Sequence, residues 1–193
     1  YDKGEGVKRN YKKAVRWYKL AAKKGVASAQ FNLGVLYSKG KGVRQSFKKA
    51  LIFYVRAAKQ GNVSAQFNLG LMYDIGEGGT PDYKRSIKWY RLAADQGYAP
   101  AQFIIGDFLL RGIGTKMDEK ESVRFLTPAA QQGHVEAQYA LGFMMARGRG
   151  TGKNLVRAYV WLNLASAKRH LGAQQEKARL AKEMLATDVA KAQ

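Results

Sequence analysis

The sequence predicts an all-α protein: an α-solenoid, coiled as a right-handed superhelix, of about five antiparallel helix hairpins. Three observations predict it: a strict period of 36 residues, helical spacing of apolar residues within each period, and cap residues where helices would begin and end. Glycine recurs at positions 4, 40, 76, 112 and 148, and again two residues later each time, without any insertion. Repeats of this length bury their apolar faces against their neighbours in the array.

The first helix of each repeat follows from a single apolar stripe. In the first repeat the stripe consists of Ala14, Trp17, Tyr18, Ala21 and Ala22, which share one helical face. A side chain that can accept hydrogen bonds from a first helical turn precedes every stripe, and these side chains are Asn10, Ser46, Asp82, Asp118 and Asn154. Closing glycines follow at Gly25, Gly61, Gly97 and Gly133.

The second helix of each repeat is expected to begin near Ser28, Ser64, Pro100 and Glu136. Proline suits a first-turn position because the N–H that it lacks would be unpaired there. Glycines recur inside this helix, at Gly34, Gly70, Gly106 and Gly142, although each costs about 1 kcal/mol relative to alanine. We expect a close approach to the alanine-rich face of the first helix to offset that cost.

The segment from Gly40 to Gly70 reads G-x-G-V, a cap, then spaced Ala, Tyr, Ala-Ala, Gly, Ala-Gln and Leu-Gly, and it resembles the Sel1-like repeat family, relatives of tetratricopeptide repeats. The resemblance covers nearly the whole chain. It implies a bacterial adaptor protein, and some members of the family act as immunity proteins. Two positions depart from the pattern. Pro128 lies inside a first helix, where we expect a kink or a late start, and Arg169 stands where glycine closes the helix in other repeats.

The repeat array is expected to occupy residues 1–170, with repeats starting near 4, 40, 76, 112 and 148, and a capping helix is expected within 171–193. Tyr1 falls in the column of Tyr37, so residues upstream are expected to be missing, and a signal peptide is one candidate for the missing segment. The segment from Gly172 to Leu185 predicts a longer, more charged helix. We expect a monomer from a bacterium, with the cell envelope favoured over the cytoplasm.

The chain is strongly basic, with 34 Lys and Arg against 14 Asp and Glu, a net charge of +20 and a pI of about 10.2. Residues 1–60 alone carry +14. Such a surface attracts an acidic protein or a polyanion. The absence of cysteine excludes disulfides and thiolate metal sites, and the 46% hydrophobic content excludes an intrinsically disordered chain.

Few side chains could support catalysis. The two histidines, His134 and His170, occupy one column of the repeat, and no second set of ligands stands beside them. The paired glycines follow helices rather than strands and lack the third glycine of a dinucleotide-binding loop. The stretch from Gly148 to Asn154 lacks the first glycine and the Ser or Thr of a P-loop. The sequence therefore predicts no catalytic residue, no metal, no cofactor and no enzyme.

Positions that break a column are the best candidates for a binding surface, because the core of an array is repetitive. Ile52 and Val55 replace basic residues of other repeats, and an apolar centre ringed by cations is typical of a protein-binding patch; a plain solvated face is the alternative. Arg56 and Asp107 also break columns and could pair internally, and Tyr98 is the clearest exception among aromatic residues that otherwise form core columns. The candidate partner-binding residues are Lys12, Lys13, Arg16, Lys48, Lys49, Ile52, Val55, Arg56, Lys84, Arg85, Lys88, Tyr98 and Asp107.

Two functions remain open. The first is a non-enzymatic scaffold for protein–protein interaction that binds an acidic protein through a groove and the basic N-terminal surface. An immunity protein that neutralises a secreted toxic effector is a specific form of this function. The second is nonspecific binding of nucleic acid or another polyanion, for which the sequence lacks aromatic residues at a fixed exposed spacing.

Overall fold

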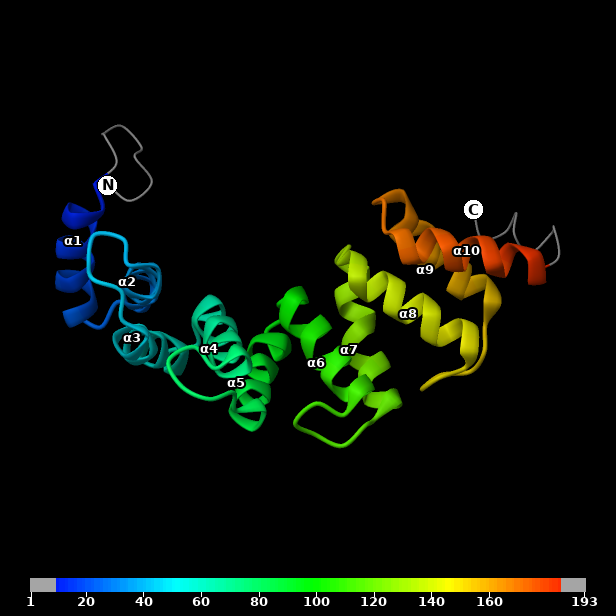
Figure 1. Ribbon diagram of the computed structural model, residues 1–193, viewed down its shortest axis with the longest axis horizontal. Helices are drawn as coiled ribbons and strands as arrows, with labels where there is room; N and C mark the ends of the chain where they lie inside the picture. Colours follow the sequence, from blue (N-terminus) through cyan, green and yellow to red (C-terminus); the bar gives the residue numbers. More distant parts are fainter. Residues whose placement is uncertain (1–9, 185–193) are drawn as a thin grey trace. The chain divides into compact units, whose positions relative to one another are not determined.

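The computed structural model describes residues 10–184, and every regular element in this range is an α-helix of 13 residues (Figure 1). The helices are α1 (Tyr11–Lys23), α2 (Ala27–Lys39), α3 (Phe47–Lys59), α4 (Val63–Ile75), α5 (Tyr83–Asp95), α6 (Ala99–Arg111), α7 (Glu119–Gln131), α8 (Val135–Arg147), α9 (Leu155–Ala167) and α10 (Leu171–Glu183). The chain divides into a first unit, residues 1–93, and a second unit, residues 94–193. Within each unit the helices pack in chain order, so the predicted all-α hairpin repeat is confirmed. The expectations for Tyr1 and for Leu185 lie outside the described residues.

All five predicted caps form at the starts of the odd-numbered helices. The Asn10 side chain accepts a hydrogen bond from the Lys13 N–H at 3.0 Å, and Asp118 accepts one from the Glu121 N–H at 2.8 Å. The other three capping side chains are Ser46, Asp82 and Asn154. At the opposite ends, Gly25, Gly61, Gly97 and Gly133 adopt left-handed φ values of 82–86°, which is the conformation that closes a helix.

The structure tests three further expectations, which concern Pro128, Arg169 and the last helix. The late start expected from Pro128 is wrong, because α7 begins at Glu119, directly after its cap. Arg169 takes the left-handed conformation of the closing glycines, with φ of 64°. The last helix is not longer than the others in the part of the chain that the structure describes, since α10 ends at Glu183.

The glycines inside the even-numbered helices mark the closest helix contacts. A Cβ atom on Gly34 would lie 2.7 Å from the Tyr54 ring, and one on Gly70 would lie 2.5 Å from the Tyr90 ring. In the second unit, Leu126 and Leu162 take the place of these rings, against Gly106 and Gly142. The close approach is therefore confirmed. The expected partner is wrong: a large side chain of the following helix, not an alanine-rich face, fills the space above each glycine.

Buried glutamines join α2, α4, α6 and α8 each to the helix before it. Gln66 donates from Nε2 to the carbonyl oxygen of Ala58 at 3.2 Å, and Gln138 donates to that of Ala130 at 3.0 Å. Gln30 does the same toward Ala22 at 3.3 Å. Each of these carbonyl oxygens also accepts from the N–H of the closing glycine, as that of Ala58 does from Gly61 at 3.0 Å, so the glutamine amide is its second donor.

Replacing Gly70 with alanine should destabilise the protein. An alanine normally favours a helix by about 1 kcal/mol, but here its Cβ would overlap the Tyr90 ring, and overpacking of this kind costs about 1–3 kcal/mol. We expect urea denaturation to show a net loss of free energy of unfolding. Gly152→Ala is the control, because a Cβ on this loop glycine meets nothing within 4 Å. A loss of equal size in both variants would contradict the close-packing argument.

The same substitution at Ser86 and Ser122 should act in opposite directions. Both serines are fully buried at equivalent positions of α5 and α7, but the Ser86 hydroxyl has no hydrogen-bond partner. Ser122 donates to the Gly106 carbonyl oxygen at 2.7 Å. We expect Ser86→Ala to raise the free energy of unfolding and Ser122→Ala to lower it, each by about 1 kcal/mol. Chemical denaturation of the two variants checks the signs.

Candidate functional site

The basic residues predicted for binding gather in the first unit, at equivalent positions of α1, α3 and α5. Residues 10–93 contain seventeen Lys and Arg against three Asp and Glu, which leaves a formal charge of +14. We call the following residues the basic face, and all are exposed: Lys12, Lys13, Arg16, Lys48, Lys49, Arg56, Lys84, Arg85 and Lys88. Nine of the thirteen predicted residues are therefore exposed cations on the odd-numbered helices of the first unit.

The cations of the basic face crowd the first turns of their helices. Lys12, Lys48 and Lys84 each occupy a first turn, and the first turns of α1, α3 and α5 contain no acidic residue. By contrast, α7 in the second unit carries Glu119 and Glu121 in its first turn. A cation at the positive end of a helix dipole is unfavourable by about 0.3–1 kcal/mol. These lysines lower helix stability, and the helix dipoles add to the positive potential outside the protein.

Some cations of the basic face rest on aromatic rings. The Lys49 ammonium lies 5.4 Å from the centroid of the Tyr37 ring, and the Arg56 guanidinium lies 5.7 Å from that of Phe53. Arg85 lies 5.6 Å from the Tyr73 ring centroid and also forms an ion pair with Asp82 at 3.3 Å. Contact with a ring fixes a cation without neutralising it, so most of the charge stays available to a partner.

The predicted apolar spot is smaller on α3 than the sequence suggested, and α1 and α5 each expose one further leucine. Ile52 is 44% exposed, whereas Val55 is half-buried and packs against the core of the first unit. Leu20 and Leu92, which sequence reasoning missed, are 50% and 40% exposed at the position equivalent to Arg56. A spacing of four residues from Arg16 places Leu20 on the polar side of α1, and this signal was present in the sequence.

Three aromatic or acidic predictions find other roles. Trp17, expected in the core, is 59% exposed. The equivalent Phe53 stacks on Tyr37 of the preceding helix, and no helix precedes α1 within residues 10–184. Tyr98 and Asp107 belong to the second unit and not to the basic face: Tyr98 is the residue before α6, and Asp107 pairs with Arg111 at 3.1 Å.

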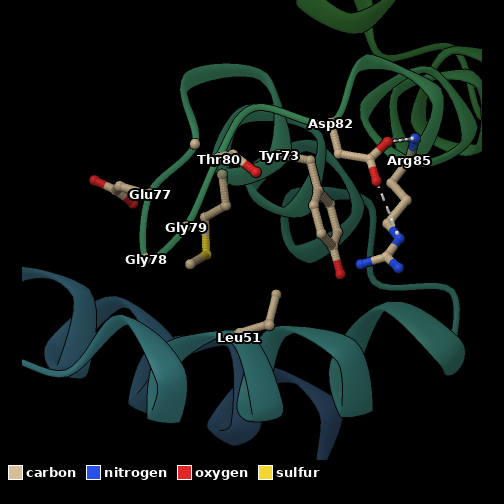
Figure 2. A pocket seen from close by; sticks show the side chains of 10 residues that line it. Leu51, Tyr73, Glu77, Gly78, Gly79, Thr80, Asp82 and Arg85 are labelled. Atoms are coloured by element: carbon tan, nitrogen blue, oxygen red, sulfur yellow. Dashed lines mark hydrogen bonds and ion pairs between the residues drawn. The ribbon is translucent and has the colours of Figure 1, made fainter.

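A pocket of about 430 Å³ opens beside α3, and Figure 2 shows its lining. We call it the Gly79 pocket. Leu51 of α3 forms its floor in Figure 2, and its lining also includes Met72, Tyr73, Asp82, Arg85 and the loop from Gly76 to Thr80. The sequence signal for it was Gly79, which stands where other repeats carry Val43, Thr115 and Thr151.

The two histidines cap helices. The Ala137 N–H donates to His134 Nδ1 at 3.3 Å, and the Ala173 N–H donates to His170 Nδ1 at 2.9 Å. Asn62 plays the same part at the start of α4. Among residues 10–184 no group of three or more His, Asp or Glu is arranged to hold a metal ion. Burial lowers the pKa of His134 from its ordinary value of 6.5.

Comparison with known proteins identifies the repeat. The Sel1 repeat family model matches residues 1–26, 27–62, 63–98, 99–134 and 135–170. Among solved structures, the chain resembles a protective antigen of uropathogenic Escherichia coli with an SLR fold, at 32% identity and a TM-score of 0.92, over 100% of this chain and 42% of that one. It also resembles a Sel1 repeat protein from Oxalobacter formigenes, at 35% identity and a TM-score of 0.83, over 90% of this chain and 51% of that one.

A third structure, Helicobacter pylori cysteine rich protein B, shares the fold at 19% identity and a TM-score of 0.51, over 66% of this chain and 92% of that one. No curated protein matches the chain. The chain thus spans about half, or less, of the length of the two relatives with higher identity. Within residues 10–184, no helix has the length and apolar character that crossing a bilayer requires.

Lowering the pH should destabilise the protein through His134. Its pKa is lower in the folded state than in the unfolded chain, so the unfolded state takes up the proton first as the pH falls below about 7. Stability is then lost progressively through and below pH 6.5. His134→Asn keeps a capping side chain, as Asn62 shows, and removes the titrating group. We expect the melting temperature of the wild type to fall more steeply with pH than that of the variant, and parallel profiles would contradict the assignment.

Proposed function

Because this chain belongs to the Sel1 repeat family, whose members generally mediate protein–protein interaction, we propose that it is a non-enzymatic scaffold that binds an acidic protein through the basic face. The observation that carries the proposal is the distribution of charge in the first unit, where seventeen basic side chains oppose three acidic ones over residues 10–93. A surface of this kind speeds the encounter with a partner of opposite charge.

The placement of the lysines supports a binding role over simple solubility. Lys12, Lys48 and Lys84 are exposed, and none of them forms an ion pair with the residues that the structure describes. A solubilising charge serves equally well anywhere on a helix, whereas these three lie at the ends where they oppose the dipole. Positions that reduce stability without an internal contact point to an external one.

Apolar side chains within the basic face favour a protein over a nucleic acid as the partner. Leu20, Ile52 and Leu92 are each at least 40% exposed among the cations, and apolar contacts at the centre of an interface supply much of its binding energy. The exposed aromatic residues of the first unit, Trp17 and Tyr83, are not at equivalent positions of the repeat. They do not form the regular series on which successive bases stack.

Immunity is the specific form of this function that the charge suits best. An acidic effector covered by a basic inhibitor would form a fast, charge-steered complex. Coexpression with effectors of the same bacterium, scored by survival of the host cell, tests this form without bearing on the broader scaffold role.

The partner can be captured from nuclease-treated lysate of the source organism, with a low-salt wash followed by a high-salt wash. Retention of one acidic protein through the high-salt wash is the expected result. Recovery of salt-labile nucleic acid alone before nuclease treatment, and of nothing after it, would overturn the proposal in favour of polyanion binding.

Reversing three first-turn charges should weaken binding while stabilising the fold. For the triple variant Lys12→Glu, Lys48→Glu and Lys84→Glu, we expect association with the captured partner to slow about tenfold at low salt. We also expect a higher melting temperature, because each glutamate favours the helix dipole. Stopped-flow kinetics and thermal unfolding measure the two effects.

The control is a second triple variant of equal net charge, Lys23→Glu, Lys24→Glu and Lys59→Glu, whose exposed lysines lie at the other ends of α1 and α3. It should slow association less and should lower the melting temperature. Equal association rates for the two triple variants would mean that net charge alone, and not the basic face, governs the encounter.

A further inference from the structure

We propose that the Gly79 pocket receives an apolar side chain from an acidic segment of the protein partner. The inference rests on the proposed function and deepens it, since it gives the place at which the partner is anchored and the chemistry of the anchoring residue. The pocket opens in the first unit, between α3 and the start of α5, two helices that contribute to the basic face.

Neither the backbone conformation nor close packing requires a glycine at position 79. Its φ is not among the left-handed values of the chain, and a Cβ added to it would meet nothing within 4 Å. At the equivalent position of the preceding loop, Val43 packs against the core of the first unit. Gly79 thus leaves open a position from which the preceding repeat packs a side chain against the core. A smaller pocket of about 270 Å³ remains at the equivalent place beside Thr151.

The floor of the pocket is apolar and only partly covered. Leu51 is half-buried, as are Ile87 and Val123 at the equivalent position of α5 and α7, whereas Val15 and Tyr159 in α1 and α9 are each 5% exposed. Figure 2 shows Leu51 projecting from α3 toward the side on which Tyr73 and the loop lie. Met72 also lines the pocket and is 4% exposed. An entering aliphatic side chain would complete the contacts that the missing valine leaves open.

The charges around the pocket favour an acidic segment. On α3, Lys48 is exposed one turn before Leu51, and Lys88 is exposed one turn after Arg85 on α5. Asp82 is already engaged, because it caps α5 through the Arg85 N–H at 2.9 Å and pairs with the Arg85 guanidinium. The Glu77 side chain points away from Leu51 in Figure 2. Glu77 is therefore the one unpaired carboxylate of the lining, and the exposed cations on α3 and α5 outnumber it.

The test uses short fluorescent peptides that share one glutamate-rich framework and differ only in a central Gly, Ala, Val or Leu. Their dissociation constants are measured by anisotropy at low salt for the wild type, for Gly79→Val and for Gly152→Val. The Gly79→Val variant fills the pocket from within. The Gly152→Val variant is the matched control, since Gly152 lies in the equivalent loop of the second unit and a Cβ there also meets nothing within 4 Å.

For the wild type and for Gly152→Val, we expect the leucine peptide to bind about tenfold more tightly than the glycine peptide. For Gly79→Val, we expect this preference to fall below about twofold, while salt-sensitive binding of all the peptides persists. The chain has five methionines, so the methyl resonance of Met72 is a local probe. It should shift on addition of the leucine peptide and not of the glycine peptide.

The outcomes distinguish anchoring in the Gly79 pocket from binding to the basic face alone. Equal affinity for all peptides on the wild type, or a leucine preference that survives in Gly79→Val, would overturn the pocket proposal and leave the basic face as the binding surface. Absence of salt-sensitive binding by every peptide would count against the acidic partner and against the pocket together. Circular dichroism of both valine variants verifies that neither has lost its helices.

Discussion

The contact between a glycine of one helix and a large side chain of the next is the constraint on which the rest of the structure depends. Gly34 admits the Tyr54 ring and Gly106 admits Leu126 at distances that no Cβ would permit. Because these contacts join consecutive helices, they fix how each helix stacks on the one before it. Because that spacing does not vary, the buried glutamines of α2, α4, α6 and α8 and the capped helix ends form at the same positions of their repeats.

The first unit carries exposed positive charge at positions where that charge lowers helix stability. Its odd-numbered helices carry lysines where a dipole favours carboxylates, and α7 in the second unit shows that the same fold accepts the favourable arrangement. The second unit also pairs more of its charges internally, as Glu176 does with Arg147 and Arg179, whose hydrogen bonds lower the pKa of that carboxyl. The second unit therefore neutralises part of its charge within the fold, whereas the first unit presents most of its charge to solvent.

The period, the helix positions and the five caps could be read from the sequence because each depends on local spacing and on the chemistry of one side chain. The features that could not be predicted depend on which repeat positions contact each other between helices. Periodicity places Gly34 on a face but does not say that Tyr54 will cover it. In the same way, the column of Trp17 predicted burial, yet its exposure depends on the helix stacked beside it. The Gly79 pocket could not be predicted, because it depends on how the loop from Gly76 to Thr80 lies relative to Leu51.

The uniform length of the repeat has a consequence for how such a protein can evolve. Every boundary between hairpins has the same elements in the same order: a left-handed glycine, a short loop, a capping side chain and a new helix. A genetic exchange that joins the loop after Gly40 to the loop after Gly76 would remove one whole hairpin and bring Gly34 against Tyr90 in place of Tyr54. The array can thus lengthen or shorten by recombination without redesign of its core, and selection can act separately on the surface of each hairpin.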